Sequence, residues 1–550
     1  MDNRKYNIYF STHTVSGIII CAILYVMFFA GSFSFFKDDI ASWQKNESYL
    51  NGKKPLQKDF NHILDSLSKH HKLKGRDFDF TLQRHNVGTY VSMTASHDTT
   101  IKKQKTHKKG GGKHGRGRGK GRGRGGDDDS AFLTYDFGKK QEADYASSYT
   151  MGEFLYRLHF LAQVNQLFPF RIGVPFGYLL AGIVSFIFLF ALITGLLLHW
   201  NKLASNFFTF RPWNKWKTVW TDLHTILGVI GFPYQLVFAV TGIILIFNSF
   251  LIIPYTKLFY KGKEEKIYKD LGIGIKSDFT YTYKKLNTPF NINTLVSATE
   301  KKWKNGDVTL VAIRNYGDDN MHVVIQGKPH NEVQMNGLGE LIYRVRDQKI
   351  ISERTPAAAP GYVNTIRGTI YHLHFGDYGG RPLRVMYFVL GVLGCVVINS
   401  GVMIWLVARD KKNIPERKRK FNFWIANIYI ASSLSMLPVT AITMIALLFL
   451  NKPGQSDIYH WFFYSWLSLS VYFLVRRNLA LTNRQTTLLS AILCLLLPVL
   501  NGIIRNNWFW KTYQRGAYDI LFIDMLFTCL AIVSAIIYWK IHNRKPEPVT

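Results

Sequence analysis

The chain has 550 residues, 47% of them hydrophobic, with 68 lysines and arginines against 36 acidic residues and a formal net charge of +32. The apolar residues gather in stretches of about 18 or more, each long enough as a helix to cross a hydrocarbon core of about 30 Å. This excludes an ordinary soluble protein, because soluble core helices rarely stay apolar on every face over such lengths. The sequence predicts a polytopic α-helical membrane protein of about eight spans, in residues 15–36, 175–198, 225–253, 384–408, 422–450, 458–475, 486–504 and 518–540.

The first span, within residues 1–36, could be mistaken for a cleaved signal sequence because Arg4 and Lys5 precede it. It is longer than the h-region of a signal peptide and stays apolar as far as Phe36. We therefore interpret it as a retained anchor.

Two long loops, residues 37–174 and 254–383, each have the pattern of a small α+β domain. In both, a helical pattern (60–69 and 293–304) is followed by segments in which apolar and polar residues alternate, as they do in strands. The predicted order is span one in 1–36, the first loop in 37–174, spans two and three in 175–253, the second loop in 254–383, span four with a basic loop in 384–420, and a separate four-span module in 421–550.

The first loop is interrupted by residues 102–130, which consist almost only of lysine, arginine, glycine and histidine before three aspartates. Such a segment cannot bury enough apolar surface to order itself, so it is predicted to be disordered. Gly-Arg repeats can bind RNA, but next to a membrane we favour a solvated tether that contacts anionic lipid or polysaccharide, and we expect no nucleic acid partner.

Lysine and arginine concentrate in the short segments beside the span ends, which are 201–218, 409–420, 476–484 and 540–545. With eight spans, all of them lie on one face together with Arg4 and Lys5. The positive-inside rule makes that face cytoplasmic. Both termini are thus expected in the cytoplasm, and the two long loops outside.

A repeat links the first and third spans. His13–Gly17 opens span one and His224–Gly228 opens span three, and each histidine is followed 18 residues later by a glycine, Gly31 or Gly242. Before spans two and four stand Leu155-Tyr-Arg-Leu-His159-Phe160 and Ile370-Tyr-His-Leu-His374-Phe375, and Thr194-Gly195 and Ser400-Gly401 lie near the far ends of these spans. The first ~410 residues therefore resemble a duplicated unit of span, outer domain and span.

Four histidines occupy repeated positions: His13 and His224 at the predicted cytoplasmic face, and His159 and His374 at the outer face. His199 and His372 lie nearby without repeat partners and are alternative ligands. A single histidine at a membrane interface is usually only an amphipathic ring. Two equivalent pairs favour haem instead, because facing imidazoles fill both axial positions of a haem iron and leave none for oxygen. Zinc is the rival metal, but it requires three or four converging ligands.

Other redox chemistry is disfavoured. The four cysteines, at positions 21, 395, 494 and 529, all fall inside spans, so neither a disulfide framework nor a C-x-x-C site is expected. No G-x-G-x-x-G follows a strand, and the inner loops are too short for a flavin or nicotinamide domain. An electron donor would have to be a separate protein or a membrane quinol.

In these motifs and their order, residues 5–410 resemble the PepSY-associated transmembrane family of bacterial inner-membrane proteins, which includes ferric-siderophore reductases. The resemblance implies PepSY-like outer domains, two b-type haems held by His13, His159, His224 and His374, and reduction of periplasmic ferric siderophores or other iron chelates. It also implies that the electrons come from the cytoplasmic side, and the apolar spans make membrane lipid an expected partner. His199 departs from the family pattern, which has tryptophan there, and is an alternative partner for His224.

The expected function is that of a transmembrane electron-transfer protein that acts as a ferric-chelate reductase. Two alternatives stay open: a transporter of iron chelates, and a PepSY-type regulatory or binding protein without redox activity. Asp519 and Asp524 in the last span lie outside the resemblance. Because acids at membrane depth are costly, we expect Asp524 to serve proton movement, a quinol site, or an ion pair with Arg505 or Arg515.

Overall fold

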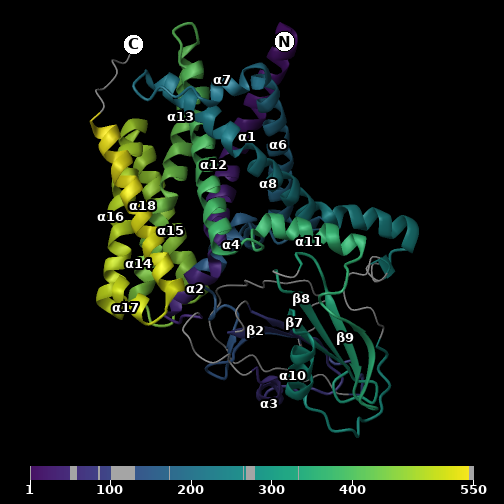
Figure 1. The fold of residues 1–550 in the computed structure, drawn as a ribbon. Coiled ribbons are helices and arrows are strands. Elements are labelled where there is room, and N and C mark those ends of the chain that lie inside the picture. Colours follow the sequence, from purple (N-terminus) through teal and green to yellow (C-terminus); the bar gives the residue numbers. More distant parts are fainter. Residues whose placement is uncertain are drawn as a thin grey trace. The chain divides into compact units, whose positions relative to one another are not determined.

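The computed structural model describes residues 2–49, 58–83, 87–100, 130–172, 174–263, 266–267, 270, 279–331 and 334–543. These residues form two compact units (Figure 1). The helical unit contains Met1–Gly52, Tyr149–Leu251 and Leu373–Thr550, and the sheet unit contains Lys53–Ser148 and Ile252–His372. The predicted basic insert, residues 102–130, lies outside the described residues except for Ser130.

Seven helical segments of the described chain are long and apolar enough to cross a membrane. They are α1 (Asn3–Ser34), α6 (Phe176–His199), the first part of α8 (Trp216–Tyr260), α12 (Gly380–Arg409), α13 with α14 (Glu416–Leu434 and Met436–Phe449), α16 (Leu479–Arg505) and α18 (Tyr518–His542). The chain is therefore a multi-pass membrane protein.

The eighth expected span, 458–475, is the helix α15 (Gln455–Arg476), which has the length of a span but is too polar to count among the seven. Asp457, His460 and several serines and tyrosines lower its hydropathy. It packs against α13 and α14. Among the described residues there are thus seven candidate spans where eight were expected. The start of α1 and the end of α18 lie at the same end of the helical unit (Figure 1).

Helix α1 lies at the centre of the first half of the bundle, in contact with α6, α12 and the short helix α4 (Met151–His159). Small residues let these helices approach closely: a Cβ added at Gly394 would lie 2.6 Å from the Phe28 ring. At the end of the bundle opposite the termini, α1 continues into α2 (Lys37–Lys45), which packs against α4 and α18.

The sheet unit is one eight-stranded antiparallel sheet in the order β10-β9-β8-β7-β1-β2-β3-β4. The first loop supplies β1 (Phe78–Leu82), β2 (Gly88–Met93), β3 (Ala131–Asp136) and β4 (Gln141–Asp144), and the second supplies β7 (Gly306–Arg314), β8 (His322–Pro329), β9 (Gly339–Arg344) and β10 (Lys349–Arg354). The two loops, predicted as separate small domains, thus share one sheet, because β1 pairs with β7 in the register Phe80↔Val311.

One face of this sheet is covered by α3 (Phe60–Ser68) and α10 (Ile292–Lys302), one helix from each loop. Alternate residues of the two central strands, such as Phe80 and Val311, join Phe60 and Val296 in the buried core. The two helices are also hydrogen-bonded to each other at their starts. Each loop therefore completes the core of the other.

A second link between the loops centres on Asp98. Its carboxylate accepts hydrogen bonds from Thr100 and, at 3.1 Å, from the Tyr281 hydroxyl of the second loop, and it lies 3.1 Å from Lys74 Nζ. The Thr100 hydrogen bonds, followed by the Lys74 ammonium, lower the pKa of Asp98 to about 2. The ionised carboxylate therefore stabilises the folded sheet unit.

The remaining elements are short connections within the helical unit, apart from α11, which joins the sheet unit to it. After α4 the chain forms α5 (Val164–Leu167) and the short strands β5 (Arg171–Ile172) and β6 (Val174–Pro175) before entering α6. A 3-10 turn, η2 (Trp200–Lys202), and α7 (Leu203–Phe207) lead from α6 towards α8. Helix α11 (Tyr362–Phe375) leads back into the bundle and turns into α12 at Gly376, whose φ of 58° suits glycine.

Candidate functional site: two pairs of histidines

His13 of α1 and His224 of α8 form the first pair, with ring centroids 5.9 Å apart. The Nδ1 atom of His13 lies 2.8 Å from the carbonyl oxygen of Ala191 in α6. The Nδ1 atom of His224 lies 2.9 Å from the carbonyl oxygen of Val397 in α12. Four helices thus position the two rings, and both side chains are half-buried.

His159 at the end of α4 and His374 near the end of α11 form the second pair, again with ring centroids 5.9 Å apart. His159 Nδ1 lies 2.7 Å from the carbonyl oxygen of Met27 in α1. His374 Nδ1 lies 2.9 Å from the Thr241 hydroxyl in α8. Helices α1 and α8 therefore contribute to both pairs.

These hydrogen bonds decide which nitrogen of each ring carries the proton. A carbonyl oxygen can only accept, so Nδ1 of His13, His159 and His224 must donate. Thr241 donates its own hydroxyl proton to the carbonyl of Val237 at 2.5 Å, which leaves its oxygen to accept from His374. In all four neutral rings Nε2 then keeps its lone pair, the state in which imidazole binds a metal ion.

A glycine stands against each ring. An added Cβ would lie 2.9 Å from His13 at Gly195, 2.6 Å from His159 at Gly31, 3.0 Å from His224 at Gly401 and 3.9 Å from His374 at Gly242. At the first three sites, the glycine follows the accepting residue, Ala191, Met27 or Val397, by one helical turn. The ring can reach the carbonyl there because no side chain stands in its way.

Two further glycines border open space. Gly17 and Gly228 follow His13 and His224 by one turn on the same helices, and no atom beyond their own helix backbone and chain neighbours lies within 4 Å of a Cβ added at either. Both helices that carry the first pair therefore leave open space one turn after the histidine.

Each pair could hold one metal ion between its rings. With metal–nitrogen bonds of about 2 Å, two imidazoles on opposite sides of one ion have their ring centres about 6 Å apart, close to the observed 5.9 Å. Within the described residues, no group of three or more histidine, cysteine or acidic side chains could hold a metal ion. Paired ligands suit a haem iron, whose macrocycle supplies the other four nitrogens, better than zinc.

The two alternative histidines lie close to these pairs. His199 ends α6 near enough to His224 for an electrostatic interaction, whereas the ring that contacts His224 is that of His13. His372 precedes His374 by two residues in α11, and residues two apart on a helix do not share a face. The ring that faces His159 is that of His374.

An aromatic cluster packs beside the second pair. The Phe238 ring lies 5.2 Å from His374, and the rings of Tyr234 and Tyr387 lie 4.2 and 5.5 Å from Phe238. A Cβ added at Gly376, two residues after His374, would lie 2.7 Å from the Tyr387 ring. This turn therefore anchors the second pair against the start of α12.

The acids of the last span are bound to the segment that follows α1. Asp524 is fully buried and accepts hydrogen bonds from Trp43 Nε1 at 2.7 Å and Asn501 Nδ2 at 2.9 Å. Asp519 accepts from the Ser48 hydroxyl at 2.5 Å and the Tyr49 amide at 3.0 Å.

The arginines expected to pair with Asp524 have other partners. Arg505 donates to the Trp43 carbonyl at 2.7 Å, and Arg515 donates to the Asn507 side chain at 2.8 Å. Among the described residues, neither lies within 4.0 Å of the Asp524 carboxylate, but Arg505 is close enough to interact with it electrostatically.

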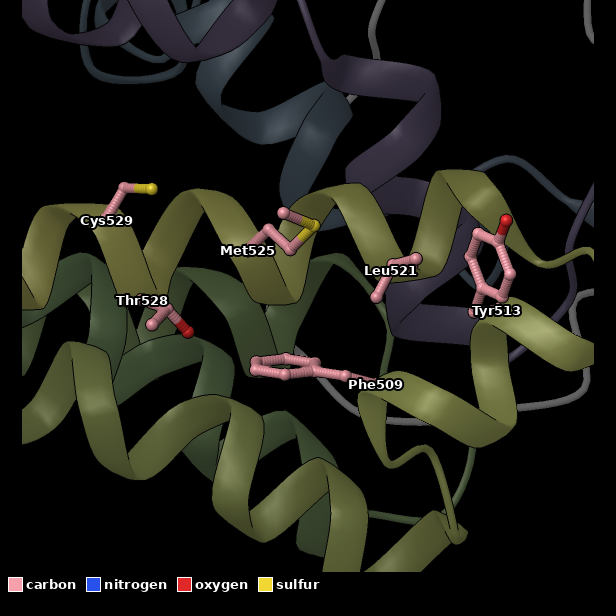
Figure 2. A pocket seen from close by; sticks show the side chains of 6 residues that line it. All are labelled: Phe509, Tyr513, Leu521, Met525, Thr528 and Cys529. Atoms are coloured by element: carbon pink, nitrogen blue, oxygen red, sulfur yellow. The ribbon is translucent and has the colours of Figure 1, made fainter.

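An apolar pocket of about 350 Å³ lies between α17 (Phe509–Gln514) and α18. Figure 2 shows its lining, which is Phe509, Tyr513, Leu521, Met525, Thr528 and Cys529. Tyr513 and Met525 are more than half exposed, as expected of a surface that faces lipid chains. It contains none of the candidate ligands.

One known family matches most of the chain. The family model described as the PepSY-associated TM region matches residues 10–408, which include both pairs and the whole sheet unit but not the helices from α13 onward. No curated protein matches the sequence.

Proposed function

The chain belongs to the family of the PepSY-associated TM region, and from this premise we propose that it is a haem-containing membrane electron-transfer protein that reduces ferric chelates. The observation that carries the proposal is the presence of two histidine pairs. In each pair the rings are 5.9 Å apart and every Nδ1 is hydrogen-bonded, so that both Nε2 atoms are available as ligands.

His13 with His224, and His159 with His374, would hold one haem b each. Bound haem supplies a reversible one-electron couple, and two axial histidines leave no position for oxygen. The hydrogen bonds from Nδ1 fix the orientation of each ring and raise the basicity of Nε2. Gly195, Gly31, Gly401 and Gly242 let the rings lie against their helices.

The correspondence between the pairs supports an internal duplication within the first ~410 residues. The contacts of His13 with Ala191 and Gly195 correspond to those of His224 with Val397 and Gly401. In the same way, the first loop corresponds to the second, each with one helix and four strands in the shared sheet. On this proposal the two loops are PepSY-like halves of one domain.

The charge distribution supports placement in a bacterial inner membrane with both termini in the cytoplasm. The segments rich in lysine and arginine adjoin the ends of the helices on the side of the two termini. The second pair would then lie towards the outer face, where a ferric siderophore or another iron chelate would receive electrons. The donor would be a separate cytoplasmic reductase or a quinol, and reduction would release iron because Fe(II) binds oxygen-rich chelators more weakly.

Absorption spectroscopy with haem quantitation tests the proposal. Purified from haem-replete cells, the protein is expected to contain about two six-coordinate b-haems per chain, and His159→Ala or His374→Ala to lose one of them. His460→Ala serves as the matched control, because this exposed histidine of α15 stacks on Tyr464 and belongs to neither pair. A colourless wild-type preparation would refute the proposal, and chelate flux into liposomes without haem would favour transport instead.

The reaction itself is tested separately. Protein reduced with dithionite and freed of excess reductant should be reoxidised by a ferric chelate in step with the appearance of Fe(II). If the haem-loaded protein stays reduced in the presence of every ferric chelate tried, ferric chelates are not its electron acceptor. The proposal that it is an electron-transfer protein would not be refuted by that result.

A further inference from the structure

Arg384 of α12 is a buried arginine. The residue is only 9% exposed, and among the described residues its Nε atom has no hydrogen-bond partner. Among the described residues it forms no ion pair. The guanidinium stays charged at any physiological pH, and its donors strongly favour a bidentate acceptor.

The neighbouring arginine of α12, by contrast, has an acidic partner. Arg381, one turn earlier, donates to Asp39 Oδ1 at 2.8 Å and is more exposed than Arg384. Burying an unpaired donor is costly, so the Nε–H group of Arg384 favours an acceptor that the described residues do not supply.

Arg384 lies one helical turn before Tyr387, a residue of the aromatic cluster beside the second histidine pair. It begins the buried stripe of α12, which continues through Tyr387, Phe388 and Gly391 at helical spacing. The Tyr387 ring packs against Phe238, which in turn contacts the His374 ring. Arg384 is therefore one helical turn from the aromatic cluster that borders this pair.

We propose that Arg384 binds a propionate carboxylate of the haem held by His159 and His374. This inference rests on the proposed function. A carboxylate is the planar acceptor that a guanidinium matches with two parallel hydrogen bonds. A lipid phosphate is a poorer candidate, because Arg384 belongs to the inward-facing stripe of α12 rather than to its lipid-facing side.

The bound propionate would fix the rotation of the macrocycle about the axis through its two histidines. The guanidinium would also offset the negative charge of the propionate near the iron. Removing it leaves that charge unbalanced, so the midpoint potential of this haem should fall, because reduction adds a further negative charge.

The test compares haem b with its dimethyl ester, in which both propionates are esterified. A His13→Ala/His224→Ala background confines binding to the second pair, and the apoprotein is prepared from haem-depleted cells. The chain with Arg384 should bind haem roughly 10- to 100-fold more tightly than the ester, the range expected for a hydrogen-bonded charge pair.

Arg384→Gln should bind both compounds equally and lower the midpoint potential, whereas Arg384→Lys should keep part of the preference because it keeps the charge. Arg381→Gln is the matched control and should keep the full preference. Equal binding of haem and ester by the chain with Arg384, or an undiminished preference in Arg384→Gln, would overturn the inference. Failure of the wild-type chain to bind haem at all would instead refute the proposed function.

Discussion

The glycine beside His159 offers a direct perturbation of one histidine pair. In Gly31→Ala, the new Cβ would lie 2.6 Å from His159 Nδ1 and 2.9 Å from Cε1. Ordinary contact begins at 3.4 Å, so the ring must move by about 0.8 Å, which can lengthen its 2.7 Å hydrogen bond to Met27 well beyond the usual range for such a bond. Loss of such an outer-shell hydrogen bond typically weakens metal binding by about 10- to 100-fold.

The assay is a haem titration of the second pair, followed by absorption in the His13→Ala/His224→Ala background. Gly17→Ala is the control on the same helix, because nothing lies within 4 Å of its added Cβ. It should leave the second pair unchanged and favour the helix by up to about 1 kcal/mol. Equal haem affinity in Gly31→Ala and Gly17→Ala would refute the assignment of Gly31 as the residue that makes room for His159.

Three further predictions concern single hydrogen-bonded groups. Thr241→Val removes the acceptor of His374 and should weaken haem binding at the second pair by about tenfold, whereas Thr241→Ser should not; equal titration curves for the two variants would contradict this. Trp43→Phe removes a donor from the buried carboxylate of Asp524 and should cost about 1–3 kcal/mol in thermal unfolding of the detergent-solubilised protein; in an Asp524→Asn background the same change should cost less. Since the pKa of Asp98 is about 2, below the roughly 3.9 of an unfolded aspartate, its contribution to stability should be complete above about pH 4 and disappear as the pH falls through 2. Hydrogen exchange of the sheet strands should therefore be slower in the wild type than in Asp98→Asn at pH 5, with a difference that shrinks on acidification.

Much of the helical unit could be predicted from the sequence, because apolar length alone identifies a span. The family was also identified correctly from the order of its motifs. The expected span with the lowest hydropathy corresponds to α15, whose serines, tyrosines and Asp457 make it polar. Its position in the bundle therefore depends on its packing against other helices rather than on its own hydropathy. The partners of Asp524 could not be foreseen, because Trp43 lies 481 residues away along the chain.

The sharing of one sheet by the two loops could not be predicted from the sequence pattern. Alternation in Phe78–Leu82 predicts a strand and its buried face, but it does not specify the partner strand. That partner, Gly306–Arg314, lies in the other loop.

The candidate histidines were identifiable by repetition, but the groups that orient them were not. Three of the four acceptors are backbone carbonyls, of Ala191, Met27 and Val397, and a carbonyl has no sequence signature of its own. The signal that was present is a glycine one turn after each of these residues. A search for histidines paired with such glycines would have predicted the contacts.

Helix α1 carries His13 and, 14 residues later, the Met27 carbonyl that orients His159. At 1.5 Å per residue, this single helix sets the distance between the two pairs along its axis at about 21 Å. The number of α1 residues between the two positions determines that distance. Inserting one residue between positions 13 and 27 would rotate one end of α1 relative to the other by about 100°, so one pair would lose its contact with α1. Inserting seven residues, close to two full turns, would keep both faces of α1 aligned and lengthen the distance between the pairs by about 10 Å. The separation of the two pairs is therefore encoded in a residue count within a single helix and does not depend on the length of any loop.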